Sequence, residues 1–303
     1  MKKILVTGAN GFIGKHVLPL LSSKGYEVYA LQRSKVSNQD KCHSVICDLS
    51  NEEQVRGVLC DIGPTHLLHL AWYTEHGKFW DSLENIDWIR RSVFLVKTFA
   101  DFGGQRALVV GSCAEYSWDR AILSEEANSY RPSSLYGQSK NFLRMLLDNL
   151  CKERGVSFAW PRIFFLFGAE EPKGKIVASM IAQFIQDQTF ILKNGSMCRD
   201  FLHVKDVAHA LVHIMDSSFQ GAINIGSGEG VDLLTLGKTI QTLVGAGSLS
   251  ISNENLPLAN LPKKLIADVT GLKTTLGWKP AFTLEEGLLD VIQSWKENLR
   301  RNS

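Results

Sequence analysis

The sequence has no apolar run that approaches the roughly 20 residues needed to span a bilayer. The apolar run near the N-terminus, residues 4–6, is far too short for a signal peptide. No block of like charge stands out, and 33 basic residues against 31 acidic ones give a net charge of +2. These absences predict a soluble, cytoplasmic protein with no basis for attraction to nucleic acid or membrane.

Signals for disulfides and metals are also missing. The six cysteines contain no CxxC pair and no plausible disulfide framework, so we expect reduced thiols. His209 and His213 have the i, i+4 spacing of helical metal ligands, but no carboxylate lies between them and no cysteine cluster lies nearby. We therefore predict no metal site.

The first half of the chain alternates short apolar runs, which predict strands, with amphipathic runs, which predict helices. Strands are expected at 2–8, 26–31, 43–48, 65–72, 106–112 and 156–165, and helices at 12–24, 51–60, 83–102 and 136–154. Strands this apolar are buried on both faces, and their alternation with helices predicts an α/β fold with a doubly wound parallel sheet of Rossmann type. Ligands of such sheets bind beyond the carboxyl ends of the strands.

After residue 165 the pattern becomes less regular. Helices are expected at 176–186 and 204–215, and a strand at 221–228. We predict a dinucleotide-binding domain over residues 1–165 and mainly a smaller substrate-binding lobe over residues 166–303. Residues 204–226 are expected to return to the main sheet.

The glycine-rich stretch GANGFIG, residues 8–14, follows the first strand and opens the first helix. Its glycines let the backbone turn tightly and approach a pyrophosphate, which then lies on the helix N-terminus. The strand–turn–helix context makes this a prediction of a dinucleotide site. The residues expected to contact the cofactor here are Gly8, Asn10, Gly11, Phe12, Ile13 and Gly14.

Tyr136 and Lys140 lie one helical turn apart, just after Pro132 and two serines that indicate a helix start. Taken alone, such a pair is often a pair of solvated surface neighbours. The rest of the chain decides between a surface pair and a catalytic pair.

Several motifs, in order along nearly the whole chain, resemble the extended branch of the short-chain dehydrogenase/reductase superfamily. The glycine spacing GxxGxxG is one of them. Ser112 stands four residues before Tyr116, as in the S/T-x-x-x-Y pattern of the family, and Tyr136 and Lys140 match Y-x-x-x-K. The stretch RDFLHVKDV, residues 199–207, resembles R-D-[FY]-x-H-V-x-D-V of nucleotide-sugar epimerases and reductases.

The resemblance implies that Ser112, Tyr136 and Lys140 are catalytic. Tyr136 would exchange a proton with a substrate oxygen, Ser112 would hydrogen-bond that oxygen, and Lys140 would also hold the nicotinamide ribose. An unperturbed tyrosine has a pKa of about 10, and we expect the ammonium of Lys140 to lower that of Tyr136.

The resemblance implies further contacts. Asp48 and Leu49 correspond to the adenine contact, and Asn85 to an asparagine that orders the long helix near the site. The segment along the cofactor corresponds to Leu70, Ala71 and Trp72. Substrate contacts are expected from Tyr73, Cys113, Phe165 and Arg199. Two long helices, 83–102 and 136–154, are of the kind that pair across a two-fold axis, so we expect a homodimer.

The cofactor preference is open between NADP and NAD. An acidic residue at the end of the second strand would bind the ribose hydroxyls of NAD, but this segment reads Gln32-Arg33-Ser34. Arg33 can form paired bonds to a 2′-phosphate and Ser34 can donate another. The alternative is that Arg33 is a solvated loop residue and NAD binds without the acid. We favour NADP.

The residues after Ser112 bear on the reaction. Family members that dehydrate sugar nucleotides resemble one another in carrying Asp-Glu there, whereas this chain has Cys113 and Ala114. Dehydration is therefore disfavoured. We expect NADPH-dependent reduction of a keto group, at C4, of a nucleotide-diphosphate sugar. The alternatives are an NAD-dependent nucleotide-sugar 4-epimerase and a non-catalytic NADP-binding sensor or scaffold.

The expected substrate contacts have alternatives of their own. Arg199 should bind the phosphates, or else form a buried ion pair with Asp200 or Asp206. Phe165 stands where the family often has asparagine, which predicts a more apolar or shifted sugar pocket. Glu115 is either a substrate contact or a structural residue. Four aromatic residues are candidates to line the pocket, the last two of them alternatively core: Trp72, Tyr73, Phe79 and Trp80.

Overall fold

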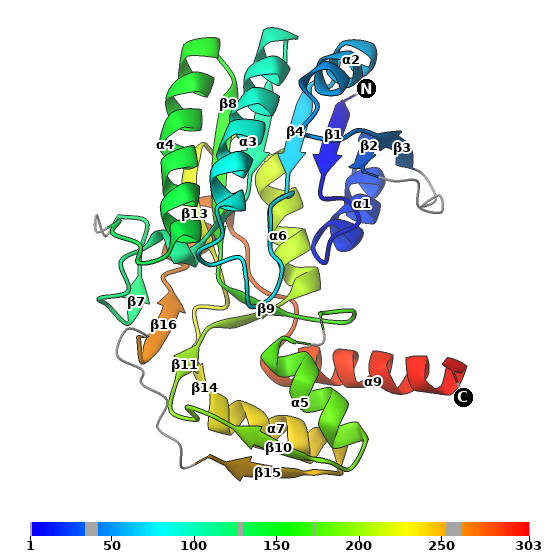
Figure 1. The fold of residues 1–303 in the computed structure, drawn as a ribbon, viewed down its shortest axis with the longest axis vertical. Coiled ribbons are helices and arrows are strands. Elements are labelled where there is room, and N and C mark those ends of the chain that lie inside the picture. The colour runs from blue at the N-terminus through cyan, green and yellow to red at the C-terminus, as the bar shows by residue number, and fades with distance from the viewer. Residues whose placement is uncertain (1, 34–41, 127–129, 173, 253–261, 303) are drawn as a thin grey trace.

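The structure, a computed structural model, describes residues 2–33, 42–126, 130–172, 174–252 and 262–302. Within these residues the largest sheet has the strand order β13-β8-β5-β4-β1-β2-β3, with β6 paired to β8, and its pairs are parallel (Figure 1). Its strands are β1 (Lys3–Thr7), β2 (Glu27–Gln32), β3 (Cys42–Ile46), β4 (His66–His69), β5 (Arg106–Val109), β6 (Gly111–Ser112), β8 (Ser157–Ile163) and β13 (Gly221–Ile225). The predicted parallel α/β sheet is confirmed.

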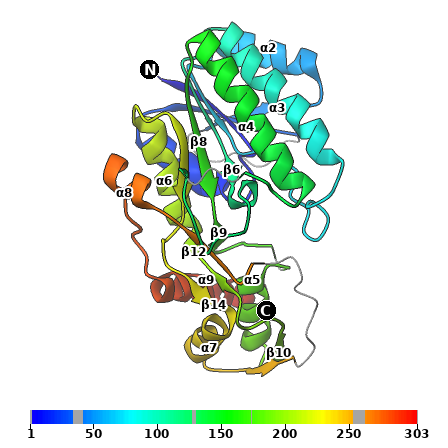
Figure 2. The ribbon, with the colours of Figure 1, turned by 90° about the vertical axis from the view of Figure 1, so that its left-hand side faces the viewer.

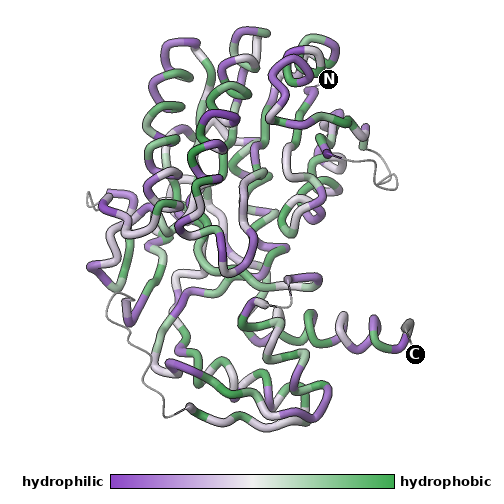
Figure 3. The backbone as a smooth tube through the Cα atoms, viewed as in Figure 1, coloured by the Kyte–Doolittle hydropathy of each residue, from purple (hydrophilic) through white to green (hydrophobic). Residues whose placement is uncertain are grey.

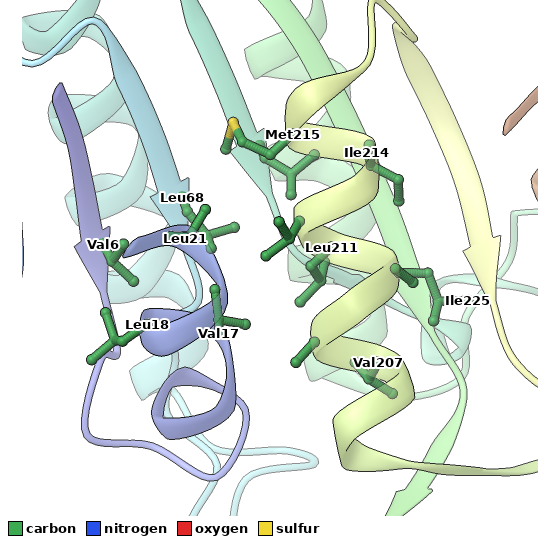
Figure 4. Packing of buried hydrophobic residues seen from close by; sticks show 14 of the residues in the cluster. Val6, Val17, Leu18, Leu21, Leu68, Val207, Leu211, Ile214, Met215 and Ile225 are labelled. Atoms are coloured by element: carbon green, nitrogen blue, oxygen red, sulfur yellow. The ribbon is translucent and has the colours of Figure 1, made fainter. Parts of the chain in front are cut away.

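Helices cover both faces of this sheet (Figures 1 and 2). One face carries α1 (Gly14–Ser23) and α6 (Val204–Asp216), and the other carries α2 (Glu52–Ile62), α3 (Glu84–Asp101) and α4 (Leu135–Arg154). Figure 4 shows Leu18 and Leu21 of α1 packed near Val6 and Leu68 of the strands, with Leu211 of α6 beside them. The hydropathy of α3 and α4 alternates along their turns, as expected for helices with one buried face (Figure 3).

A second hydrophobic core lies beyond the carboxyl ends of these strands, in the lower part of Figure 2. It is built from α5 (Ile176–Ile185), α7 (Leu233–Val244), α9 (Leu284–Asn302), and the paired strands β9 (Phe165–Phe167) and β12 (Phe201–His203). Beside it lie β10 (Thr189–Leu192) with β15 (Ser248–Ile251), and a small sheet of β14 (Val231–Asp232), β11 (Cys198–Arg199), β16 (Lys264–Ala267) and β7 (Ile122–Leu123). The remaining elements are the 3-10 turn η1 (Cys113–Glu115) and α8 (Thr270–Leu276).

The strand β13 pairs with β8 at the edge of the main sheet, and α6 packs beside α1. The chain therefore crosses to the second core after β8 and comes back. A domain boundary at residues 165–166 stays a prediction. Among the helices of the described ranges, none is long and apolar enough to cross a membrane.

Candidate active site

The glycine-rich turn lies at the carboxyl end of β1 and leads into α1. Gly8 has a φ of +69°, and a Cβ there would lie 2.8 Å from the backbone nitrogen of Ala71. A Cβ on Gly14 would lie 2.3 Å from the carbonyl oxygen of Gly8. Only glycine fits these two positions, and the result is a side-chain-free cradle at a helix N-terminus. This shape suits a pyrophosphate.

The other residues expected around the dinucleotide surround this turn. Phe12, Ile13, Leu70 and Trp72 are half-buried, while Leu49 is buried. These residues are apolar and leave part of their side chains exposed, except for Leu49.

Asn10 and Asp48, two polar residues expected to contact the dinucleotide, are each held by a hydrogen bond. Asn10 donates a hydrogen bond from Nδ2 to Gln32 Oε1 at 2.8 Å, which fixes a neutral amide at the end of β2. The carboxylate of Asp48 accepts from the backbone nitrogen of Ser50, and this bond holds the pKa of Asp48 below its ordinary value. Arg33 is exposed after β2, and its charge acts on Asp48 in the same direction. The expected contact from Ser34 lies outside the described residues.

Ser112 and Tyr136 come together because α4 packs closely on η1. Ser134 caps α4, since its side chain accepts from the backbone nitrogen of Gly137 at 3.1 Å. A Cβ on Gly137 would lie 2.1 Å from the carbonyl oxygen of Ala114, so glycine permits the close approach. The side chains of Ser112 and Tyr136 are hydrogen-bonded. The structure therefore brings the predicted serine and tyrosine into one site.

Lys140, one turn further along α4, is buried beside them. Its Nζ donates to the carbonyl oxygen of Val110 at 2.8 Å and lies 3.9 Å from the centre of the Trp72 ring. Burial lowers the pKa of Lys140 to about 7, and the negative charge of Glu115 opposes this change. The ammonium is therefore poised to titrate near neutral pH.

The expected lowering of the pKa of Tyr136 is wrong for the chain by itself. Burial raises the pKa of this phenol, and the hydrogen bond with Ser112 only partly offsets it. The prediction considered the charge four residues away and left out desolvation, which disfavours the phenolate. Tyr136 is therefore a protonated phenol at neutral pH.

An aromatic wall encloses the phenol. The ring centroids of Phe79 and Trp80 lie 5.0 and 5.8 Å from that of Tyr136, and the Trp72 centroid lies at 6.4 Å. The Trp72 indole donates to Asn85 Oδ1 at 2.9 Å, and the predicted role of this asparagine in ordering the long helix stays a prediction. Phe79 is buried and Trp80 is partly exposed, and both lie against the tyrosine. The wall makes the surroundings of the phenol largely apolar.

Arg199 is buried, and its guanidinium lies close enough to Cys113 for its charge to lower the pKa of the thiol. Burial has the larger effect on this thiol and raises its pKa to about 12, so Cys113 is neutral. The guanidinium donates to the backbone oxygen of Cys198 at 2.8 Å and lies 5.5 Å from the centre of the Phe165 ring. The cation therefore acts electrostatically on the residue that follows Ser112.

The alternative of an ion pair between Arg199 and Asp200 or Asp206 does not occur among the described residues. Asp200 accepts from the backbone nitrogens of Ser227, Gly228 and Ala267. Asp206 accepts instead from two backbone nitrogens in the loop before α9, those of Ala281 and Phe282. Arg199 is a buried cation without either of the expected carboxylates, which suits an anionic ligand.

Glu115 lies in the protein interior. It is fully buried and forms an ion pair with Arg162, whose Nε lies 2.7 Å from its Oε2. The sequence left Glu115 open between a substrate contact and a structural role, and Arg162 was not predicted as part of the site. A charged residue inside the apolar run of the predicted strand 156–165 was the available signal, because a buried arginine needs a partner. The predicted contact Tyr73 is half-buried and donates to Glu75.

No group of three or more His, Cys, Asp or Glu side chains in the described ranges is arranged to hold a metal ion. The fold and the cluster of serine, tyrosine and lysine beside a glycine cradle define a dinucleotide-dependent enzyme of the extended short-chain dehydrogenase/reductase class. Residues 4–226 match the NAD dependent epimerase/dehydratase family, and the chain belongs to it.

Individual relatives are distant. The chain is 25% identical to UDP-glucuronic acid decarboxylase 1 of Danio rerio, over 100% of this chain and 74% of the relative. It is 24% identical to dTDP-4-dehydro-6-deoxy-D-allose reductase of Streptomyces bikiniensis, over 99% and 98%. The crystal structure of Thermus thermophilus UDP-glucose 4-epimerase with NAD is similar with a TM-score of 0.84 and 20% identity, over 97% and 99%. The predicted family, fold and enzyme class are confirmed.

Proposed function

We propose that the protein reduces a keto group, at C4, of a nucleotide-diphosphate sugar with NADPH. The observation that carries the proposal is Arg199, a buried guanidinium whose charge acts on the thiol of Cys113, the residue that follows Ser112. A diphosphate bound there would place the attached sugar near the phenol of Tyr136. The curated relatives support this substrate class, since their names include a UDP-sugar and a dTDP-sugar enzyme.

The arrangement fits transfer of a proton to a carbonyl oxygen. A reduced nicotinamide cofactor held at the glycine turn of Gly8 and Gly14 would supply the hydride for the carbonyl carbon. Tyr136 donates its proton to the oxygen, and the hydroxyl of Ser112 hydrogen-bonds the same oxygen. The alcohol forms, and the phenolate left on Tyr136 takes a proton from solvent. The raised pKa of Tyr136 keeps the phenol protonated before the reaction, as a donor must be.

The residues that follow the serine argue against dehydration. Cys113 is a neutral, buried thiol, and Ala114 carries no ionisable group. The carboxylate of Glu115 is bound to Arg162 and faces the core. No acid or base for an elimination lies among these three residues.

The absence of an acid at the end of β2 supports NADP. Gln32 presents a neutral amide held by Asn10, and Arg33 is exposed next to it. The charge of Arg33 acts on the carboxylate of Asp48, which follows β3 rather than β2. A 2′-phosphate would meet a cation rather than a carboxylate at β2.

The test is to purify the protein, record its reduced-nicotinamide absorbance, and follow NADPH oxidation with 4-keto nucleotide sugars. We expect an empty protein that consumes NADPH, and a Tyr136→Phe variant whose kcat falls about 10²- to 10⁴-fold while it still binds NADPH. Tightly retained NAD with interconversion of C4 epimers and no net NADPH consumption would establish the epimerase instead. Intact NADP binding with no turnover would establish a sensor or scaffold. A Tyr136→Phe variant that works at the parent rate would refute the assigned chemistry.

A further inference from the structure

A buried charge pair lies directly behind the catalytic serine. Glu115 and Arg162 are both completely buried, with 2.7 Å between Oε2 and Nε. The indole Nε1 of Trp160 donates to the same carboxylate at 2.9 Å. Taking two charges out of water usually costs as much as their attraction returns. Such a pair is a weak source of stability, so stability alone does not explain its position next to the site.

The pair fixes the backbone of Ser112. The backbone nitrogen of Ser112 donates to Glu115 Oε1 at 2.7 Å, and the backbone nitrogen of Ala114 donates to Ser112 Oγ at 3.2 Å. The two bonds form a capping box on η1. A Cβ on Gly111 would lie 2.4 Å from Glu115 Oε1, so the chain is pressed against the carboxylate at this point. The peptide that carries the catalytic hydroxyl therefore has little freedom to move.

The carboxylate also acts on the two ionisable catalytic groups. Its charge raises the pKa of Lys140 against the effect of burial, and it raises the pKa of Tyr136 in the same direction as burial. Both effects favour the protonated forms, the ammonium and the phenol. The titratable or charged groups around them come from several elements: Cys113 and Glu115 on η1, His69 on β4, Arg162 on β8, and Tyr136 and Lys140 on α4.

We infer that Glu115 is a positioning residue for the reductase site, in which its carboxylate holds the backbone of Ser112 and supplies negative charge that acts on Lys140 and Tyr136. The inference rests on the proposed function for its consequence in turnover. The placement of the carboxylate against the catalytic cluster does not depend on which sugar is reduced.

The test replaces the charge and keeps the shape, with Glu115→Gln. The titration of Lys140 is followed in the full-length protein by NMR of isotope-labelled lysine side chains, and Lys140→Arg identifies the signal. In the parent the ammonium should titrate near pH 7. Without the carboxylate the midpoint should move to lower pH by about one unit. With a working substrate, kcat should fall about tenfold or more while KM for the sugar changes little.

The matched control is Tyr130→Phe, which removes a hydroxyl that accepts from Arg162 Nη1 at 3.3 Å but leaves every charge in place. We expect it to lower thermal stability slightly and to leave the Lys140 midpoint and kcat unchanged. If Glu115→Gln does not fold because it strands the guanidinium, the double variant with Arg162→Gln removes both charges. A smaller shift in the same direction is then expected, because loss of the guanidinium charge favours the ammonium.

Equal behaviour of Glu115→Gln and Tyr130→Phe would reduce the role of the carboxylate to folding and overturn the inference. An unmoved Lys140 midpoint would do the same. The titration uses no substrate, so it stands apart from the proposed function. A parent protein that reduces no keto sugar would refute the proposed function. An unchanged titration midpoint of Lys140 in Glu115→Gln would refute the role of Glu115.

Discussion

The choice between NADPH and NADH turns on Arg33, and Arg33→Asp tests it. Arg33 is exposed after β2, beside an amide, Gln32, that hydrogen bonding to Asn10 fixes at the end of that strand. A carboxylate in place of the guanidinium would repel a 2′-phosphate and accept hydrogen bonds from the free ribose hydroxyls of NADH. The substitution should therefore reverse the cofactor preference from NADPH to NADH.

The size of the change follows from the exposure of the site. A hydrogen bond to a charged group contributes about 1.5–3 kcal/mol, and solvent around Arg33 places the contact at about the lower end. Repulsion between two like charges about 4 Å apart in water adds about 1 kcal/mol. The sum, about 2.5 kcal/mol, corresponds to a loss of roughly 50- to 100-fold in NADPH affinity. NADH has no phosphate to lose and should bind as well or better.

The assay is kcat/KM for each cofactor at fixed keto sugar, with dissociation constants from quenching of tryptophan fluorescence. Arg33→Gln is the matched control, because it removes the charge without reversing it and should lose only about tenfold for NADPH. The preference of the parent should also weaken as salt is added, since the contact is solvent-exposed. An Arg33→Asp enzyme that still prefers NADPH as strongly as the parent would refute the assignment of Arg33 to the phosphate.

Two further substitutions probe the site and the assembly. Trp72→Leu removes the ring 3.9 Å from Lys140 Nζ, and a desolvated cation–π contact contributes about 1–2 kcal/mol. The titration midpoint of Lys140 should therefore move to lower pH, and kcat/KM should fall about tenfold. An unchanged midpoint by lysine NMR would contradict this. We propose a homodimer through α3 and α4, where Phe142 is 52% exposed, so Phe142→Glu should halve the mass in sedimentation. Leu299→Glu on α9, at a leucine 43% exposed, is the control and should leave the mass unchanged.

The sheet was predictable because its strands are short apolar runs between amphipathic helices, and periodicity reports burial directly. The break within the predicted strand 106–112 was not predictable. It falls at Val110, between β5 and β6, where the carbonyl oxygen accepts from Lys140. The predicted strand 156–165 likewise ends at Ile163, and the chain turns into β9, which pairs with β12. At both breaks the chain contacts residues that are distant in the sequence. The local sequence pattern contains no information about such contacts.

The same limit applies to the candidate site. Ser112, Tyr136 and Lys140 could be named from motif spacing, and the structure brings them together on β6 and α4. Glu115 was left between two roles because its partner, Arg162, comes 47 residues later on another strand. Spacing along one chain shows which residues share a helix face, but it does not show which buried charge meets which.

The direction in which the pKa of Tyr136 moves has a consequence for the reaction. A pair at i, i+4 suggests a phenolate stabilised by an ammonium, which is the form that abstracts a proton and begins an oxidation. In the folded chain, burial and the charge of Glu115 both favour the phenol, and Lys140 itself loses its proton near pH 7. The phenol of Tyr136 is therefore protonated and can act as a proton donor. We take this state as support for the proposed reduction, in which a protonated Tyr136 gives its proton to a carbonyl oxygen.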